Sequence, residues 1–293
     1  MILSGFTDES ADNLEGQIRA TKTLGWDYLS ARTFNGKNIH DVAEPDFEII
    51  CEQLAAKDIK VAEFGTLIGS WGKTISSDWD ITLKEIERCI PRMQKLSVKY
   101  ARIMSYAQNP WGETQYDQER FKRLREITQR FEDVGLVALH ENCMNWGGFS
   151  ADHTLRLLDE VPNLRLIFDT GNPIFQRDRS KSEPHPWQDS LEFYNKVKHA
   201  IAHVHIKDAM MPLAAAHPEY TFPGEGEANL QVILEDLIRS EYDGFIAIEP
   251  HVGKVFHDPG ANKDEDRAFD LYIQYGRAFE KLIEKVKGRI IGD

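Results

Sequence analysis

The chain has 293 residues, a formal net charge of −13 and no block of Lys and Arg. Nucleic-acid binding depends on basic side chains that neutralise phosphates, so this charge balance argues against a nucleic-acid partner. The three cysteines, Cys51, Cys89 and Cys143, form no CxxC pair and indicate no disulfide framework. The N-terminus turns acidic too early for a signal peptide, and no apolar run approaches membrane-spanning length. These features predict a cytoplasmic protein without a membrane partner.

Short apolar runs recur along the chain, and an amphipathic, charged segment separates each from the next. The runs predict eight strands: "ILSGF", "WDYLSA", "IKVAEFG", "KYARIMSY", "LVALHE", "LRLIFD", "IAHVHIK" and "GFIAIE". The segments between them predict helices at Asp12 to Leu24, Pro45 to Ala56, Asp78 to Leu96, Tyr116 to Val134, Ser150 to Glu160, Pro186 to His199 and Ala228 to Ser240, with a last helix at Asp264 to Lys287. Pro45 and Pro186 suit the first turn of a helix.

Strands that alternate with helices indicate parallel βαβ units, because parallel strands need a crossover connection. Eight such units predict an α/β fold, a (β/α)8 TIM barrel formed by a single domain over residues 1–293. The competing fold is a doubly wound open sheet, which usually carries a Gly-rich phosphate turn after its first strand. The first strand here is followed by "TDESADN", which lacks such a turn.

Polar side chains stand at the ends of the last four predicted strands. The four endings are "ALHEN", "IFDTG", "HVHIKD" and "AIEPH", which place Glu141, Asp169, His205 and Glu249 at corresponding positions. In a barrel of this kind the chemistry lies at the C-terminal ends of the strands, so these four side chains are expected at one mouth. Each has a simpler interpretation when taken alone: a turn residue, a solvated carboxylate or a hydrogen-bonded core histidine.

Three carboxylates at one mouth would repel one another unless a cation neutralised them. Three oxygen ligands and one imidazole suit Mn²⁺, Mg²⁺ or Co²⁺, and zinc also accepts His and carboxylate ligands. The sequence therefore predicts one divalent metal ion bound by Glu141, Asp169, His205 and Glu249.

Several motifs resemble one known family. "SGFTDES", "LHEN", "FDTGNP", "HVHIKD", "YTFPGEGE" and "YDGFIAIEPH" are similar to those of the xylose-isomerase-like TIM-barrel family of sugar and sugar-phosphate isomerases and epimerases. The match runs nearly end to end, although the motifs are not specific for a substrate.

The resemblance implies that the four strand-end residues bind one divalent ion, with manganese first and magnesium, cobalt or zinc as alternatives. It also implies that Glu141 and Glu249 are the catalytic acid–base pair on opposite faces of a sugar. Of the two histidines in "HVHIKD", the second matches the family ligand, so the resemblance favours His205 over His203.

The sequence departs from the family pattern at three positions. Ser30 stands where members often end the second strand with Glu, while Asn172 and Met211 replace a His and an Arg of the epimerases. These differences weaken the case for a ketose epimerase and leave the predicted metal ligands unchanged.

Four other residues are candidates for substrate binding: Asn172, Lys207, His140 and Trp111. Lys207 would share the inward face of His205, although a salt bridge to a ligand carboxylate is an equal alternative. His140 can orient a carboxylate, and Trp111 can stack on a sugar or serve as a simple lid. The loop "PGEGE" suits an anion through its glycines, but its glutamates would repel one, which favours an unphosphorylated substrate.

The leading functional hypothesis is a metal-dependent sugar isomerase or epimerase that acts through an enediolate on a keto-sugar or polyol-derived substrate. A lyase that dehydrates or cleaves a keto-sugar or cyclitol would use the same constellation. A nuclease would need further ligands and a basic face, and a sugar-binding barrel without catalysis would bind its ligand in the absence of metal. Relatives are often dimers or tetramers, so the resemblance implies a homo-oligomer.

Overall fold

The computed structural model describes residues 1–211, 218–253 and 265–292. Within these ranges, one sheet of eight parallel strands runs in the order β1-β12-β9-β8-β7-β6-β5-β2. Its strands are β1 (Ile2–Gly5), β2 (Tyr28–Ala31), β5 (Lys60–Phe64), β6 (Tyr100–Ile103), β7 (Val137–Glu141), β8 (Arg165–Asp169), β9 (Ile201–Ile206) and β12 (Phe245–Ile248). A parallel bridge between Phe6 and Ser30 brings the two edge strands together, so the sheet is a nearly closed barrel. The predicted (β/α)8 fold is confirmed.

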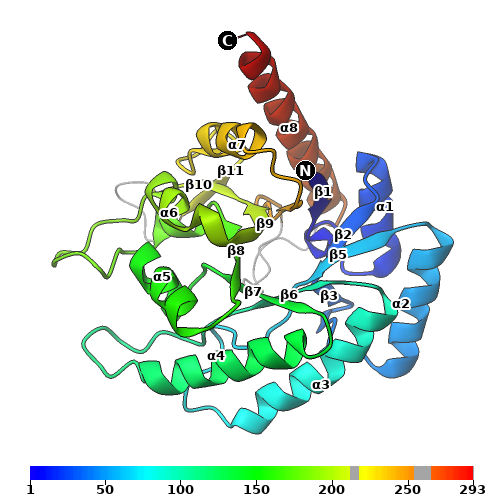
Figure 1. Ribbon diagram of the computed structural model, residues 1–293. Helices are drawn as coiled ribbons and strands as arrows, with labels where there is room; N and C mark the ends of the chain where they lie inside the picture. The colour runs from blue at the N-terminus through cyan, green and yellow to red at the C-terminus, as the bar shows by residue number, and fades with distance from the viewer. Residues whose placement is uncertain (212–217, 254–264, 293) are drawn as a thin grey trace.

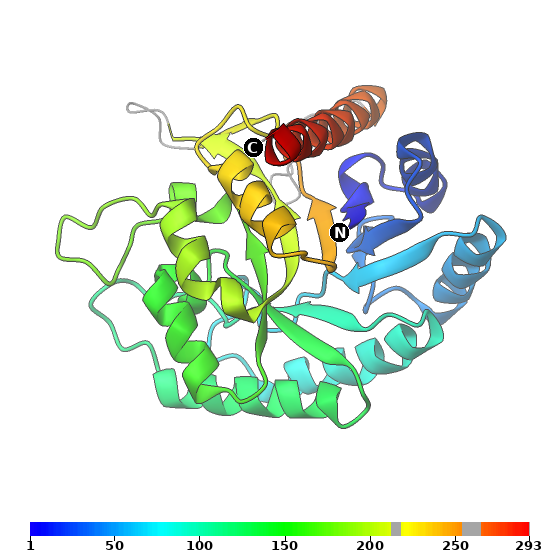
Figure 2. The ribbon, with the colours of Figure 1, turned by 45° about the horizontal axis from the view of Figure 1, so that its top comes forward.

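Helices surround the strands on the outside (Figures 1 and 2). They are α1 (Leu14–Leu24), α2 (Glu44–Ala56), α3 (Trp79–Lys95), α4 (Asp117–Glu132), α5 (Ala151–Glu160), α6 (Ser190–Val197), α7 (Leu230–Arg239) and α8 (Glu265–Gly292). Two short antiparallel pairs of strands lie at the C-terminal mouth of the barrel. They are β3 (Thr33–Phe34) with β4 (Lys37–Asn38), and β10 (Asp208–Met210) with β11 (Glu219–Thr221).

Helix α6 begins later than the sequence predicts. Pro186 does not lie in its first turn, because the neighbouring Trp187 forms an antiparallel bridge with Arg177. The helix starts instead after Asp189, whose side chain accepts a hydrogen bond from the backbone N–H of Glu192 at 2.7 Å. An Asp at this position satisfies a free N–H of the first turn, which sets the helix start more strongly than the proline does.

Aromatic rings fill the N-terminal end of the barrel. The ring of Phe245 lies edge-on to Tyr28 and Tyr100, with centroids 5.0 and 6.4 Å apart, and it stacks on His203 at 6.0 Å. Phe6 lies one layer above and meets the ring of His205 edge-on at 4.9 Å. These layers make the interior a packed core, as in other barrels of this type.

Helix α8 closes the outside of the barrel against the first helix. The indole of Trp26 donates to Glu280 at 2.9 Å, and Arg277 donates to the carbonyl of Thr23 at 2.7 Å.

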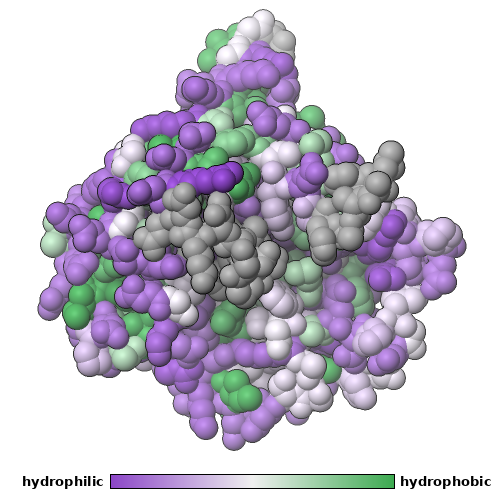
Figure 3. All heavy atoms as spheres, turned by 180° about the vertical axis from the view of Figure 1, so that it is seen from behind, coloured by the Kyte–Doolittle hydropathy of each residue, from purple (hydrophilic) through white to green (hydrophobic). Residues whose placement is uncertain are grey.

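Hydrophilic residues dominate the coloured surface in Figure 3, and its apolar patches are small and separate. Among the described helices, none is long and apolar enough to cross a membrane.

The burial of His40 is expected to make the folded protein less stable in acid. Burial lowers its pKa from 6.5 to about 4, against the opposing charge of Asp41. Between these two values the unfolded chain binds more protons than the folded chain, so stability falls as the pH drops from 6.5 to 4, by about 3 kcal/mol in total. In urea titrations over this range, His40→Leu is expected to remove about this much of the pH dependence of the unfolding free energy. Equal pH slopes in the variant and the wild type would contradict this expectation.

Candidate metal centre

The four predicted ligands converge at the C-terminal mouth. Glu141 and Asp169 are the last residues of β7 and β8, His205 lies near the end of β9, and Glu249 directly follows β12. Each offers one ligand atom, and these four atoms all lie within 4.8 Å of one another. All four side chains are buried, with Asp169 and His205 fully inaccessible.

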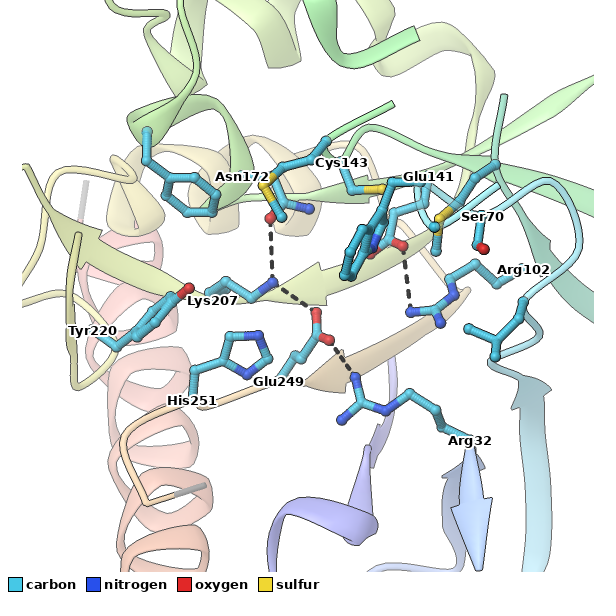
Figure 4. Close-up of a pocket in the computed structure, with 16 residues that line it drawn as sticks. Arg32, Ser70, Arg102, Glu141, Cys143, Asn172, Lys207, Tyr220, Glu249 and His251 are labelled. Carbon is cyan, nitrogen blue, oxygen red and sulfur yellow. Dashed lines mark hydrogen bonds and ion pairs between the residues drawn. The ribbon is translucent and has the colours of Figure 1, made fainter. Parts of the chain in front are cut away.

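A cavity of about 320 Å³ opens beside this cluster (Figure 4). Its polar and charged lining comes from loops and strand ends around the mouth, and three of the lining side chains are cationic. The lining residues are Arg32, Leu67, Ser70, Trp71, Gly72, Arg102, Met104, Glu141, Cys143, Met144, Asn172, Phe175, Lys207, Tyr220, Glu249 and His251.

Asp169 divides its two oxygens between the backbone and the site. Oδ1 accepts hydrogen bonds from the N–H groups of Gly171 and Asn172 at 2.9 and 2.8 Å, which shapes the turn after β8. Oδ2 lies 3.0 Å from the ammonium of Lys207. The residue is therefore both a turn former and a candidate ligand, because each role uses a different oxygen.

Glu249 is held between two cations. Its Oε1 accepts a hydrogen bond from Arg32 at 2.5 Å, and its Oε2 lies 2.9 Å from Lys207. Arg32 also donates to Asp8 and Glu9 at 2.9 to 3.0 Å, so it links the loops that follow β1, β2 and β12. Figure 4 shows Arg32, Glu249 and Lys207 in a row along the cavity wall.

Glu141 forms the opposite wall. Its Oε1 lies 3.0 Å from Nδ1 of His205, and its Oε2 lies 3.4 Å from Arg102. Nε2 of His205 faces away from the cavity and lies 2.9 Å from Oε1 of Glu63. Arg102 is almost fully buried, and its Nε has no hydrogen-bond partner among the described residues.

The charges of the site shift its pKa values in both directions. Burial raises the pKa of Asp169 to about 6, against the attraction of Lys207. Burial also acts on Glu249, but Lys207, His251 and Arg32 hold its pKa well below the ordinary value. For His205, burial lowers the pKa, but Glu63 and Glu141 outweigh it and raise the pKa to about 10. Nearby cations, chiefly Lys207, Arg32 and Arg102, therefore favour the ionised form of Glu249 and Glu141.

These side chains fit a divalent cation. Three buried oxygens, Oε2 of Glu141, Oδ2 of Asp169 and Oε2 of Glu249, accept no hydrogen bond from any described residue. Their only close cations among the described residues are Lys207, at 3.0 and 2.9 Å from the Asp169 and Glu249 oxygens, and Arg102, at 3.4 Å from the Glu141 oxygen. Three buried carboxylates that face one another favour a further positive charge, which a divalent ion would supply. Three carboxylates and one imidazole are also a donor set that hard divalent ions accept.

The sequence matches the family model described as "Xylose isomerase-like TIM barrel" over residues 18–270. The chain belongs to this family. An inosose dehydratase from Lacticaseibacillus casei is 25% identical over 141 residues, which cover 43% of this chain and 44% of that protein. The match to this curated relative thus spans less than half of the relative's length.

Solved structures with this fold cover nearly the whole chain. A D-tagatose 3-epimerase-like protein superposes with a TM-score of 0.70 and 18% identity, covering 99% of this chain and all of that one. The IOLI protein, solved with a zinc atom, also gives 0.70 with 16% identity, covering 98% of this chain and 99% of that one. At these identities the likeness establishes the fold of the xylose isomerase-like barrel, and the zinc atom belongs to the IOLI structure.

Two of the four substrate-binding candidates in this xylose isomerase-like barrel lie at the cavity. Lys207 donates a hydrogen bond to Oδ1 of Asn172 at 3.3 Å, and both residues line the cavity. His140 instead lies beneath the β7–α5 loop, where its Nε2 is 3.1 Å from Oγ of Ser105. Trp111 lies on a separate surface depression with Tyr116, and its indole donates to Glu183 at 3.0 Å. Neither His140 nor Trp111 lines the cavity.

The backbone of the loop "PGEGE" binds a carboxylate from the same chain, that of Asp208. The carboxylate of Asp208 accepts hydrogen bonds from the N–H groups of Gly224, Gly226 and Ala228 at 2.8 to 3.1 Å. A Cβ at Gly226 would lie 2.3 Å from Oδ1 of Asp208, so the close approach needs glycine at this position. The backbone donors that would bind a phosphate are therefore occupied.

Sequence reasoning missed Arg32, Arg102 and Glu63, which contact the proposed ligands.

Arg32 forms buried ion pairs with Asp8, Glu9 and Glu249, a group of four side chains called here the Arg32 cluster. Removing the cation would leave these buried carboxylates without their compensating charge. In the metal-free protein, Arg32→Met is expected to reduce the unfolding free energy by about 3 to 5 kcal/mol. Denaturant titration measures this loss. Lys95→Met, which removes an exposed pair with Glu48, is the control and should cost far less, because solvent screens an exposed ion pair. Equal effects of the two variants would contradict a structural role for the Arg32 cluster.

Proposed function

We propose that this chain is a divalent-metal-dependent lyase that removes water from a polyhydroxy ketone, either a cyclic keto-polyol or a keto-sugar. The observation that carries the proposal is the position of Lys207. Its ammonium lies in the same cavity as Glu141, between Asp169 and Glu249, so an acid stands close to a base. The name of the curated relative, an inosose dehydratase, supports the same reaction.

Glu141, Asp169, His205 and Glu249 would hold the ion, with manganese first and magnesium, cobalt or zinc as alternatives. When bound, the ion would draw electrons from a carbonyl and a neighbouring hydroxyl of the substrate and so acidify the adjacent C–H. The zinc atom in the IOLI structure supports a metal in a barrel of this fold.

Glu141 is the proposed base. It removes the proton next to the substrate carbonyl, and the guanidinium of Arg102, which lines the same cavity, can stabilise the negative charge that develops on the substrate oxygen. Lys207 donates a proton to the hydroxyl on the next carbon, which leaves as water while the C=C bond forms. Glu141 ends with one proton more and Lys207 with one fewer, and transfer through solvent restores both.

Asn172 and Ser70 offer polar contacts to further hydroxyl groups, and Trp71 and Phe175 offer apolar surface beside them. The proposed substrate is unphosphorylated, because Asp208 occupies the backbone donors of the loop after β9. A cavity of about 320 Å³ suits a compound the size of a single sugar or cyclitol.

An isomerase or epimerase is the second candidate. It is favoured by the placement of Glu141 and Glu249 on facing walls of the cavity, where each can address one face of a substrate carbon. The epimerase-like protein of the same fold supports it. Against it, Arg32 and Lys207 lie 2.5 and 2.9 Å from the oxygens of Glu249, closer than Arg102 lies to Glu141 at 3.4 Å, so Glu249 is the weaker base of the two.

The test is a panel of inososes and ketohexoses incubated with metal-loaded protein in D₂O. A dehydratase yields a product lighter by one water, with the ultraviolet absorbance of a conjugated ketone. An epimerase or isomerase yields a product with the mass of the substrate plus incorporated deuterium. Ligand binding that persists without metal, and without turnover of any compound, would favour a sugar-binding barrel instead.

A further inference from the structure

Glu63 has no place in the proposed reaction, yet it contacts a proposed ligand. It lies on β5 inside the barrel, is fully buried and does not line the cavity. Its Oε1 is 2.9 Å from Nε2 of His205 and 3.1 Å from Nε2 of His203. A fully buried glutamate in the interior of a barrel requires a reason, because burying a carboxylate is costly unless it is paired.

The ring of His205 has two distinct sides. Nδ1 faces Glu141, a proposed ligand at the cavity, while Nε2 faces Glu63, below the cavity and away from it. Only Nδ1 is placed among the other three ligand atoms. For Nδ1 to bind an ion it must carry no proton, and a neutral imidazole then carries its proton on Nε2.

We propose that Glu63 is a positioning residue for the metal centre: it accepts the Nε2 proton of His205, fixes the ring orientation and leaves Nδ1 free for the ion. This inference rests on the proposed function, since it needs the metal. A carboxylate behind a ligand histidine is a general device that orients the ring and increases its basicity.

His203 completes the arrangement from below. Its ring stands perpendicular to that of His205, with centroids 5.2 Å apart, and its Nε2 faces the same oxygen of Glu63. Phe245 stacks on the other side of His203. The carboxylate is therefore held by two imidazoles, and the stacked ring of Phe245 limits the movement of His203.

The test compares Zn²⁺ affinity, by competition with a chromophoric chelator, for wild type, Glu63→Gln and Glu85→Gln. The amide that replaces the carboxylate in Glu63→Gln keeps its shape but can donate as well as accept, so it no longer selects one tautomer. We expect Glu63→Gln to bind Zn²⁺ about 10- to 100-fold more weakly. Glu85 is also buried and paired, with Lys73, but lies on α3 outside the barrel, so its variant is expected to keep wild-type affinity. Thermal unfolding by circular dichroism verifies that both variants fold.

A second measurement uses the wild-type protein. With ¹⁵N-labelled histidine, NMR of the Zn²⁺-loaded chain is expected to show His205 with a proton on Nε2 and none on Nδ1, the signal being assigned by its loss in His205→Asn. Wild-type affinity in Glu63→Gln, or a proton on Nδ1, would overturn the positioning role alone. Two ions per wild-type chain and one in Glu63→Gln would overturn it in favour of a second metal site at Glu63, His203 and His205. No Zn²⁺ binding by the wild type would defeat the proposed function and this role together.

Discussion

The double variant Asp169→Asn, His205→Asn is expected to lose stoichiometric metal and to turn over substrate about a thousandfold more slowly than the wild type. Lewis-acid stabilisation is worth several kcal/mol, and each 1.36 kcal/mol corresponds to a factor of ten in rate. The Asn side chain at position 169 keeps an oxygen that can accept the hydrogen bonds of Gly171 and Asn172, so the turn after β8 is expected to survive.

Elemental mass spectrometry of protein purified without chelators measures the metal content. About one manganese, cobalt, magnesium or zinc per chain is expected in the wild type. Asp152→Asn, which alters an exposed carboxylate paired with Lys196, is the control and should retain the metal. A double variant that kept its metal and its rate would disprove the assigned ligand set.

The variant Lys207→Met is expected to lower the rate of water elimination by about 10²- to 10⁴-fold, the usual contribution of a positioned acid or base. The proton next to the carbonyl should still exchange with solvent, because Glu141 and the metal remain. Deuterium uptake into recovered substrate, measured by mass spectrometry, separates the two steps. Lys207 also pairs with two buried carboxylates, so the comparison is made on metal-loaded protein whose folding has been verified by circular dichroism.

Lys198→Met is the matched control for this variant, because Lys198 is half-exposed and pairs with Asp236 on the outside of the barrel. It should leave both elimination and exchange unchanged. Equal loss of elimination and exchange in Lys207→Met would place Lys207 in substrate binding alone. Unaltered elimination would remove it from the reaction.

The strands and the convergence of the four strand-end side chains were predictable because both follow local rules. Eight apolar runs that alternate with amphipathic segments indicate a parallel barrel, and strand-end polar residues in a barrel meet at one mouth. The start of α6 was predicted wrongly, since Pro186 suggested a first turn while the bridge between Arg177 and Trp187 depends on a tertiary contact.

The supporting residues of the site were harder to predict. Glu63 lies within the run "IKVAEFG" and was counted as part of an apolar strand, although a carboxylate on an otherwise buried strand was a usable signal. Arg32 follows β2 by one residue, and its partners Asp8, Glu9 and Glu249 come from other strand ends. Their contacts depend on which side chains face each other across the mouth, and no sequence spacing reports that.

The Arg32 cluster joins the ends of the first two strands to the end of the last strand, β12: Arg32 and Glu249 are 217 residues apart. A contact of such long range forms only after most of the intervening chain has been ordered, because the loop-closure entropy must first be overcome. During synthesis, Arg32 and Asp8 leave the ribosome early, and Arg32 can pair with Glu249 only after β12 has been made. We therefore expect the proposed metal centre to be among the last parts of the molecule to assemble. A chain would then bind the metal only after its barrel has closed.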